Sequence, residues 1–170
     1  MLSACFTVAA LSAVWPMPCT PQAEPMLVLA ASPSVPDIQA AVDELEHGGV
    51  VRIPAGRCEA IGTVEVPGGV RLVGAGPKET VLYRAGGTDA KSSAPILRLD
   101  GSNGRPSRIE GLGLIGMEDP ASASWDTGLQ LTQTRDFRVT NCRFRRFGAA
   151  GIGTRGACTG VIDHCLFVDN

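Results

Sequence analysis

The last third of the chain repeats itself at a constant offset of 23 residues, and this repeat limits the possible folds more than any other feature. The hexapeptide VTNCRF at 139–144 is matched by IDHCLF at 162–167, and a looser copy, IEGLGL, occupies 109–114. Apolar residues fall at positions 1, 4 and 6 of the two close copies, which is not helical spacing. Two short extended pieces joined by a bend fit this pattern. Copies stacked at the strand spacing of about 4.8 Å predict a parallel β-helix.

The bend itself is expected at the third position of each copy, which is Asn141 in one and His164 in the next. A short polar side chain such as Asn tolerates a left-handed backbone, so a turn explains both residues. The Cys that follows, Cys142 or Cys165, would then point inward and stack on its counterpart. The stacked pair is interpreted as two free thiols in the core, because free Cys behaves as a small hydrophobe; a disulfide is the alternative.

A helix is expected before the strands. Apolar residues recur at helical spacing over 36–47, Ser34 is in the N-cap position, and Gly48-Gly49 would end the helix. Such a helix would cover the open end of the first coil. Short β-type runs separated by Pro- and Gly-containing turns follow, at 50–53, 63–66, 70–73 and 80–83.

This opening resembles a known family. The segments DIQAAV from Asp37, GGVVRIPAG from Gly48 and VPGGVRLVGAG from Val66 are similar to the start of the pectate-lyase-like superfamily of right-handed parallel β-helices. The likeness is close over 36–84 and loose over the later coils. It implies an all-β, right-handed parallel β-helix with an N-terminal capping α-helix. It does not fix an activity, because lyases, hydrolases, epimerases and non-enzymatic spikes share this opening.

Residues 1–31 differ in composition from the 32–170 segment that holds the expected cap and coils. They contain no Lys or Arg, and an apolar run begins at Leu2. That run is too short for a membrane span and resembles the core of a secretory signal, although the usual positive start is missing. We therefore expect export to the periplasm, the cell surface or the medium. The chain stops directly after the second repeat without a closing cap, which predicts truncation at the C-terminus.

Candidate binding residues come from the outward positions of the repeat. Arg138, Arg143 and Arg145 would form an arginine-bearing strip with Asp163, and such a strip can hold sugar carboxylates. An ordinary solvated surface, in which neighbouring aspartates balance the arginines, is the alternative. Trp125, in one of three expected loops (85–94, 101–107 and 116–127), would either stack on a sugar ring or fold back over the coil.

The sequence contains no P-loop, nucleophile elbow or HExxH motif, so no catalytic residue is assigned. We expect the whole protein to bind or cleave polysaccharide, as a polyuronate lyase or a glycoside hydrolase, and this part to lack a complete active site. Neither a nucleic-acid partner nor a resident metal is expected, although a lyase would use Ca²⁺. The expected state is a monomer, and the alternative function is a non-catalytic adhesin, spike or structural module.

Overall fold

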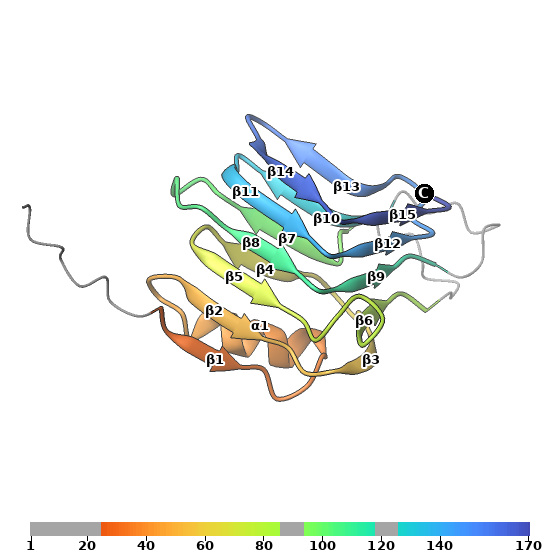
Figure 1. Ribbon diagram of the computed structural model, residues 1–170, viewed down its shortest axis with the longest axis horizontal. Helices are drawn as coiled ribbons and strands as arrows, with labels where there is room; N and C mark the ends of the chain where they lie inside the picture. Colours follow the sequence, from red (N-terminus) through yellow and green to blue (C-terminus); the bar gives the residue numbers. More distant parts are fainter. Residues whose placement is uncertain (1–24, 86–93, 118–125) are drawn as a thin grey trace, which may run out of the picture.

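The computed structural model describes residues 25–85, 94–117 and 126–170, and it is a parallel β-helix with one short N-terminal helix (Figure 1). Every strand pairing is parallel, and each complete coil gives one strand to each of three sheets.

The six-stranded sheet contains, in spatial order, β1 (Leu27–Leu29), β2 (Gly49–Arg52), β5 (Val70–Val73), β8 (Arg108–Glu110), β11 (Arg135–Thr140) and β14 (Thr159–Asp163). The four-stranded sheet contains β4 (Val64–Pro67), β7 (Leu97–Asp100), β10 (Thr127–Thr132) and β13 (Ala150–Arg155). The five-stranded sheet contains β3 (Gly56–Glu59), β6 (Thr80–Tyr83), β9 (Gly113–Ile115), β12 (Arg143–Arg145) and β15 (Leu166–Val168).

The register of the repeat is confirmed. Val139 pairs with Ile162 on one side and with Ile109 on the other. Phe144 pairs in the same way with Phe167 and Leu114. The loose copy is therefore a coil of the same stack, with a longer connection inside its repeat.

The core consists of inward rows that run up the stack. Val51, Leu72, Ile109 and Val139 lie in register on neighbouring strands, and each is fully buried. Outward residues on the same strands are mostly charged, so alternation along each strand separates core from surface. The row stays buried until the last coil, where Ile162 is 45% exposed.

The bend between β11 and β12 also agrees with the sequence. Asn141 has a φ of 51° and His164 a φ of 50°, both in the left-handed region. Gly111, at the same place in the loose copy, has a φ of 68°. Three successive coils thus turn with one backbone conformation, which the residue types Gly, Asn and His accommodate in different ways.

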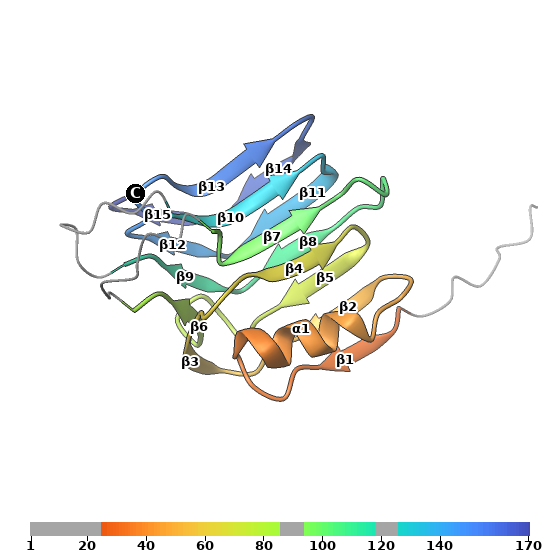
Figure 2. The same cartoon turned by 180° about the vertical axis from the view of Figure 1, so that it is seen from behind.

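The helix α1 (Val35–Asp43) covers the N-terminal end of the stack, where it packs against β1, β2 and β4 (Figure 2). Ser34 caps it by accepting a hydrogen bond of 3.3 Å from the Asp37 amide. Ile38 is fully buried beneath it. Capping and burial together explain why so short a helix is stable here.

The expectation that the helix reaches residue 47 is wrong. The helix ends at Asp43, and a tighter turn follows in which the Leu45 amide donates to the Val42 carbonyl over 3.0 Å. This turn buries Leu45, and Gly48, with a φ of 85°, then leads the chain into β2. A Cβ at Gly48 would lie 2.5 Å from the Gly69 carbonyl oxygen, so the close approach requires glycine.

β1 and β3 are among the strands that the sequence analysis did not predict. β3 begins at Gly56, which was expected to be part of a turn, and only Cys58 of its four residues has the apolar character of a strand. β1 lies inside residues 1–31, the segment expected to be a leader, and pairs with β2. The β-helix therefore includes residues from Leu27 onward, whereas the leader itself stays a prediction.

Candidate functional site

The four outward residues selected from the repeat lie on two different sheets. Arg138 and Asp163 belong to β11 and β14 of the six-stranded sheet. Arg143 and Arg145 belong to β12 of the five-stranded sheet, beyond the bend at Asn141. The expected single strip is therefore divided by a corner of the coil. Trp125 lies outside the described residues.

The six-stranded sheet carries a row of three arginines, Arg71, Arg108 and Arg138, which we call the arginine ladder. Arg108 is the register partner of Arg71 on one side and of Arg138 on the other. Neighbouring members are therefore one strand spacing apart, about 4.8 Å between backbones. The sequence analysis missed Arg71 and Arg108, although each directly precedes an inward aliphatic residue, as Arg138 does.

A second outward row lies two residues further along the same strands. It consists of Val73, Glu110, Thr140 and Asp163, on β5, β8, β11 and β14. Two members of the ladder reach diagonally into this row on the next coil. Arg71 Nη2 lies 2.6 Å from Glu110 Oε2, and Arg138 Nη2 lies 2.5 Å from Asp163 Oδ2.

Arg108 faces a different neighbour. The same diagonal step from Arg108 leads to Thr140, which carries no charge. Arg108 is exposed and has no hydrogen-bond or ion-pair partner among residues 25–85, 94–117 and 126–170. The central cation of the ladder is thus left available to an external anion.

The Asp163 carboxylate is the most strongly stabilised charge on this surface. Hydrogen bonds from the Thr140 hydroxyl and from the Arg138 guanidinium lower its pKa to about 2. His164 Nδ1 lies 3.6 Å from the other carboxylate oxygen, but its side chain is 81% exposed. Asp163 is therefore fixed as an anion, and His164 is a solvated turn residue.

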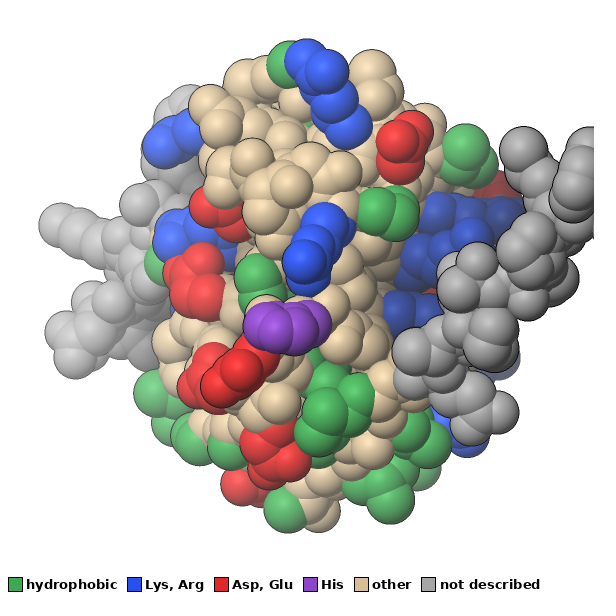
Figure 3. Space-filling model, turned by 90° about the vertical axis from the view of Figure 1, so that its left-hand side faces the viewer, with side chains coloured by type: hydrophobic (Ala, Val, Ile, Leu, Met, Phe, Trp, Pro, Cys, Tyr) green, Lys and Arg blue, Asp and Glu red, His purple; other side chains and the backbone are tan. Residues whose placement is uncertain are grey.

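The outer surface of the six-stranded sheet is more basic than the chain as a whole, whose formal net charge is −2. In Figure 3, Lys and Arg side chains gather on the right-hand side of the view, which is the side of this sheet. Arg52, on β2, extends the second row beside Val73 and is also exposed. The two rows thus hold four arginines and two carboxylates, and β11 adds exposed Arg135 and Asp136.

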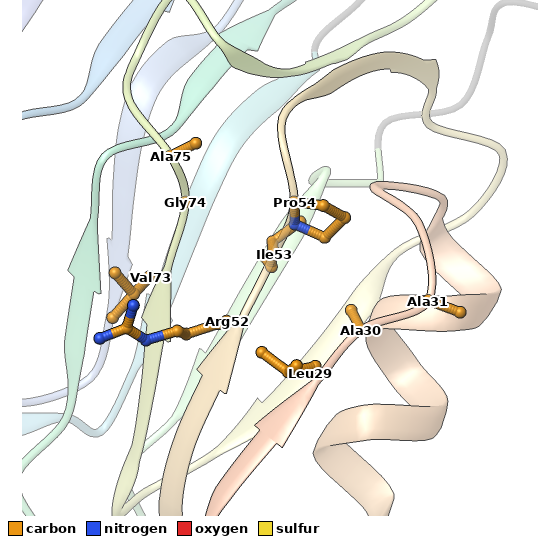
Figure 4. Close-up of a pocket in the computed structure, with 9 residues that line it drawn as sticks. All are labelled: Leu29, Ala30, Ala31, Arg52, Ile53, Pro54, Val73, Gly74 and Ala75. Atoms are coloured by element: carbon orange, nitrogen blue, oxygen red, sulfur yellow. The ribbon is translucent and has the colours of Figure 1, made fainter.

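A shallow pocket of about 330 Å³ adjoins Arg52 at the ends of β1, β2 and β5. Its lining is mostly small and apolar: Leu29, Ala30, Ala31, Ile53, Pro54, Val73, Gly74 and Ala75. Figure 4 shows the Arg52 side chain extending from β2 towards Val73 at one edge of this lining. Arg52 is the one charged side chain among the residues that line it, so the pocket offers an apolar surface beside a single cation.

The five-stranded sheet carries three further arginines. Arg143 and Arg145 are both half-buried, and Arg145 Nε lies 3.9 Å from Asp169 Oδ2. On the first coil of this sheet, Arg57 lies over the Tyr83 ring, 4.7 Å from its centroid. Arg143 and Arg145 are therefore less exposed than Arg108 and Arg138, whereas Arg57 is exposed.

Neither the carboxyls of the second row nor the stacked thiols Cys142 and Cys165 form a catalytic arrangement. Glu110 and Asp163 share a row at about 9.6 Å, two strand spacings, but each is ion-paired with an arginine of the ladder, whereas glycoside hydrolysis needs two carboxyls that flank a bound sugar. Burial raises the pKa of the Cys142 thiol to about 12, so Cys142 is no nucleophile. Its counterpart Cys165 is also a free thiol, with a pKa raised by burial.

Two further observations apply only to the part of the chain that the structure describes. No three His, Cys, Asp or Glu side chains come together there in the way that a metal ion requires. No helix there is long and apolar enough to cross a bilayer.

Comparison with known proteins supports the fold and adds no function. No protein-family model matches the chain, and a search of curated proteins found no significant match. Among solved structures, the chain is similar to ORF18 of Geobacillus virus E2, with a TM-score of 0.50 and 16% sequence identity over 69% of this chain. The chain spans about a quarter of that viral protein, 26% of its length. At this identity the likeness concerns the fold alone.

Proposed function

We propose that this chain is an exported β-helix domain that binds acidic polysaccharide, and that it belongs to a protein of the pectate-lyase-like type. The arginine ladder carries the proposal. It is a straight row of guanidinium groups on a stiff sheet, and its central member has no partner within the described residues. Guanidinium groups bind carboxylates with two parallel hydrogen bonds, so regularly spaced arginines suit a polymer that carries a carboxylate on each sugar.

Cleavage by these residues is less well supported than binding. Both carboxylates of the arginine-bearing surface are ion-paired with the ladder, whereas hydrolysis needs one carboxyl that donates a proton and one that acts as base or nucleophile. Lysis of a uronate would need a base beside the ring proton, and Ca²⁺ remains an expectation for that case. We therefore assign binding to the described coils and leave cleavage as a proposal for the whole protein.

The test is a binding panel with the purified chain. Isothermal titration against polygalacturonate and alginate, with dextran and galactan as neutral controls, should show binding to the two polyuronates only. The affinity should fall as NaCl rises, because exposed charge pairs are screened at high salt. Binding to all four polymers, or to none of them, would overturn the proposal. Release of unsaturated ends, monitored by ultraviolet absorbance, would show that cleavage accompanies binding.

A further inference from the structure

We propose that Arg108 is the anchor for the ligand carboxylate, and that Glu110 and Asp163 are intramolecular competitors that occupy the two flanking arginines. This inference rests on the proposed function and names the groups that set its affinity. It makes a prediction that a uniformly basic surface does not make: an added carboxylate weakens binding strongly at position 140 and only slightly at position 132.

The geometry of the two rows carries the inference. Each arginine of the ladder has the second-row residue of the next coil on its diagonal. For Arg71 and Arg138 that residue is an acid, held at 2.6 Å and 2.5 Å respectively. For Arg108 it is Thr140, which is uncharged and lies in register with Asp163 on the next coil. Along the ladder, Arg71 and Arg138 are paired with carboxylates, and Arg108 between them has no partner in the part of the chain that the structure describes.

The exposure of these groups shows that they are accessible to a ligand. The Arg71 and Arg138 side chains are 43% and 45% exposed, and Glu110 is 33% exposed. Ion pairs this exposed are weak, so a ligand carboxylate can replace the protein's own carboxylate at little cost. At Arg108 it has no carboxylate of the described residues to replace. The polymer would therefore bind first at Arg108 and extend along the stack towards Arg71 and Arg138.

The same substitution at two places provides a sharp test. Thr140→Asp would give Arg108 an internal carboxylate partner without removing any arginine. Thr132→Asp is the matched control, because it makes the same change of charge on the four-stranded sheet, where Thr132 pairs with Asp100 and Arg155. Titration with polygalacturonate should show that Thr140→Asp weakens binding about tenfold or more, whereas Thr132→Asp changes it less than threefold.

Two further variants complete the design. Arg108→Gln should weaken polygalacturonate binding about tenfold, and Glu110→Gln should strengthen it several-fold by freeing Arg71. Arg98→Gln, which removes a half-buried arginine paired with Glu65 on the four-stranded sheet, should leave binding unchanged. Circular dichroism of each variant establishes that the fold is retained.

The outcomes separate this inference from the proposed function. If the unmodified chain binds polygalacturonate, and Arg108→Gln and Thr140→Asp bind it with the same affinity, the proposed function is retained. The role of Arg108 as the anchor is then wrong. Weaker binding by Glu110→Gln would overturn the role of Glu110 as a competitor. If the unmodified chain binds none of the glycans, the proposed function fails and this inference fails with it.

Discussion

Truncation of Phe144 to Ala is the sharpest test of the stacking register. Phe144 is fully buried on β12, and its ring stacks on that of Phe167 with centroids 5.0 Å apart and planes 9° apart. Removal of a buried Phe side chain costs about 3–5 kcal/mol, because burial is lost and a cavity remains. Phe167 is 46% exposed on the last coil, so Phe167→Ala should cost about half as much, roughly 1.5–2.5 kcal/mol.

The assay is equilibrium unfolding in urea, followed by circular dichroism. Both variants should lower the midpoint while the slope stays the same, and the change for Phe144→Ala should be about twice that for Phe167→Ala. Equal losses would mean that the two rings are equally buried in solution, which contradicts the open last coil. A Phe144→Ala variant as stable as the unmodified chain would refute the register itself.

Three further predictions concern single groups. The folded pKa of Asp163 is about 2, whereas its ordinary value is 3.8. The ionised carboxylate therefore stabilises the fold fully above pH 4, and this contribution is lost as the pH falls towards 2. Asp163→Asn should flatten that part of an acid-unfolding curve. Asn141 has a φ of 51°, so Asn141→Val should cost about 1–2 kcal/mol in thermal unfolding, whereas Asn141→Gly should be close to neutral. A thiol reagent at pH 8 should label half-buried Cys158 in the native protein but not Cys142, because burial raises the pKa of the Cys142 thiol to about 12. Labelling of Cys142 before unfolding would show that its coil opens.

The sequence was most informative where one residue decides a local conformation. The constant offset between matching residues set the register of the last coils, since inward side chains must lie above one another. Asn141 and His164 marked the bend because few residue types accept its backbone. β3 was missed because a strand with a single inward residue has no alternation to detect, and β1 was missed because its three residues continue an apolar leader-like segment.

The site was harder to find from the sequence. Arg143 and Arg145 looked continuous with Arg138, yet the bend at Asn141 turns them onto another sheet. Arg71 and Arg108 are 37 residues apart along the chain and adjacent across the sheet. Which residues lie side by side on neighbouring coils depends on the length of the loops that connect the strands. These loop lengths vary from coil to coil, so the repeat alone does not predict the pairs.

The sequence by itself determined the architecture and the inward rows, because periodic burial of apolar side chains allows few alternatives. Tertiary structure alone decided which charges meet. A carboxylate lies diagonally ahead of Arg71 and of Arg138, and a threonine lies ahead of Arg108, because strands remote in sequence stack in one register. The stack brings those side chains within a few ångströms of one another, and that distance sets the strength of an interaction between charges.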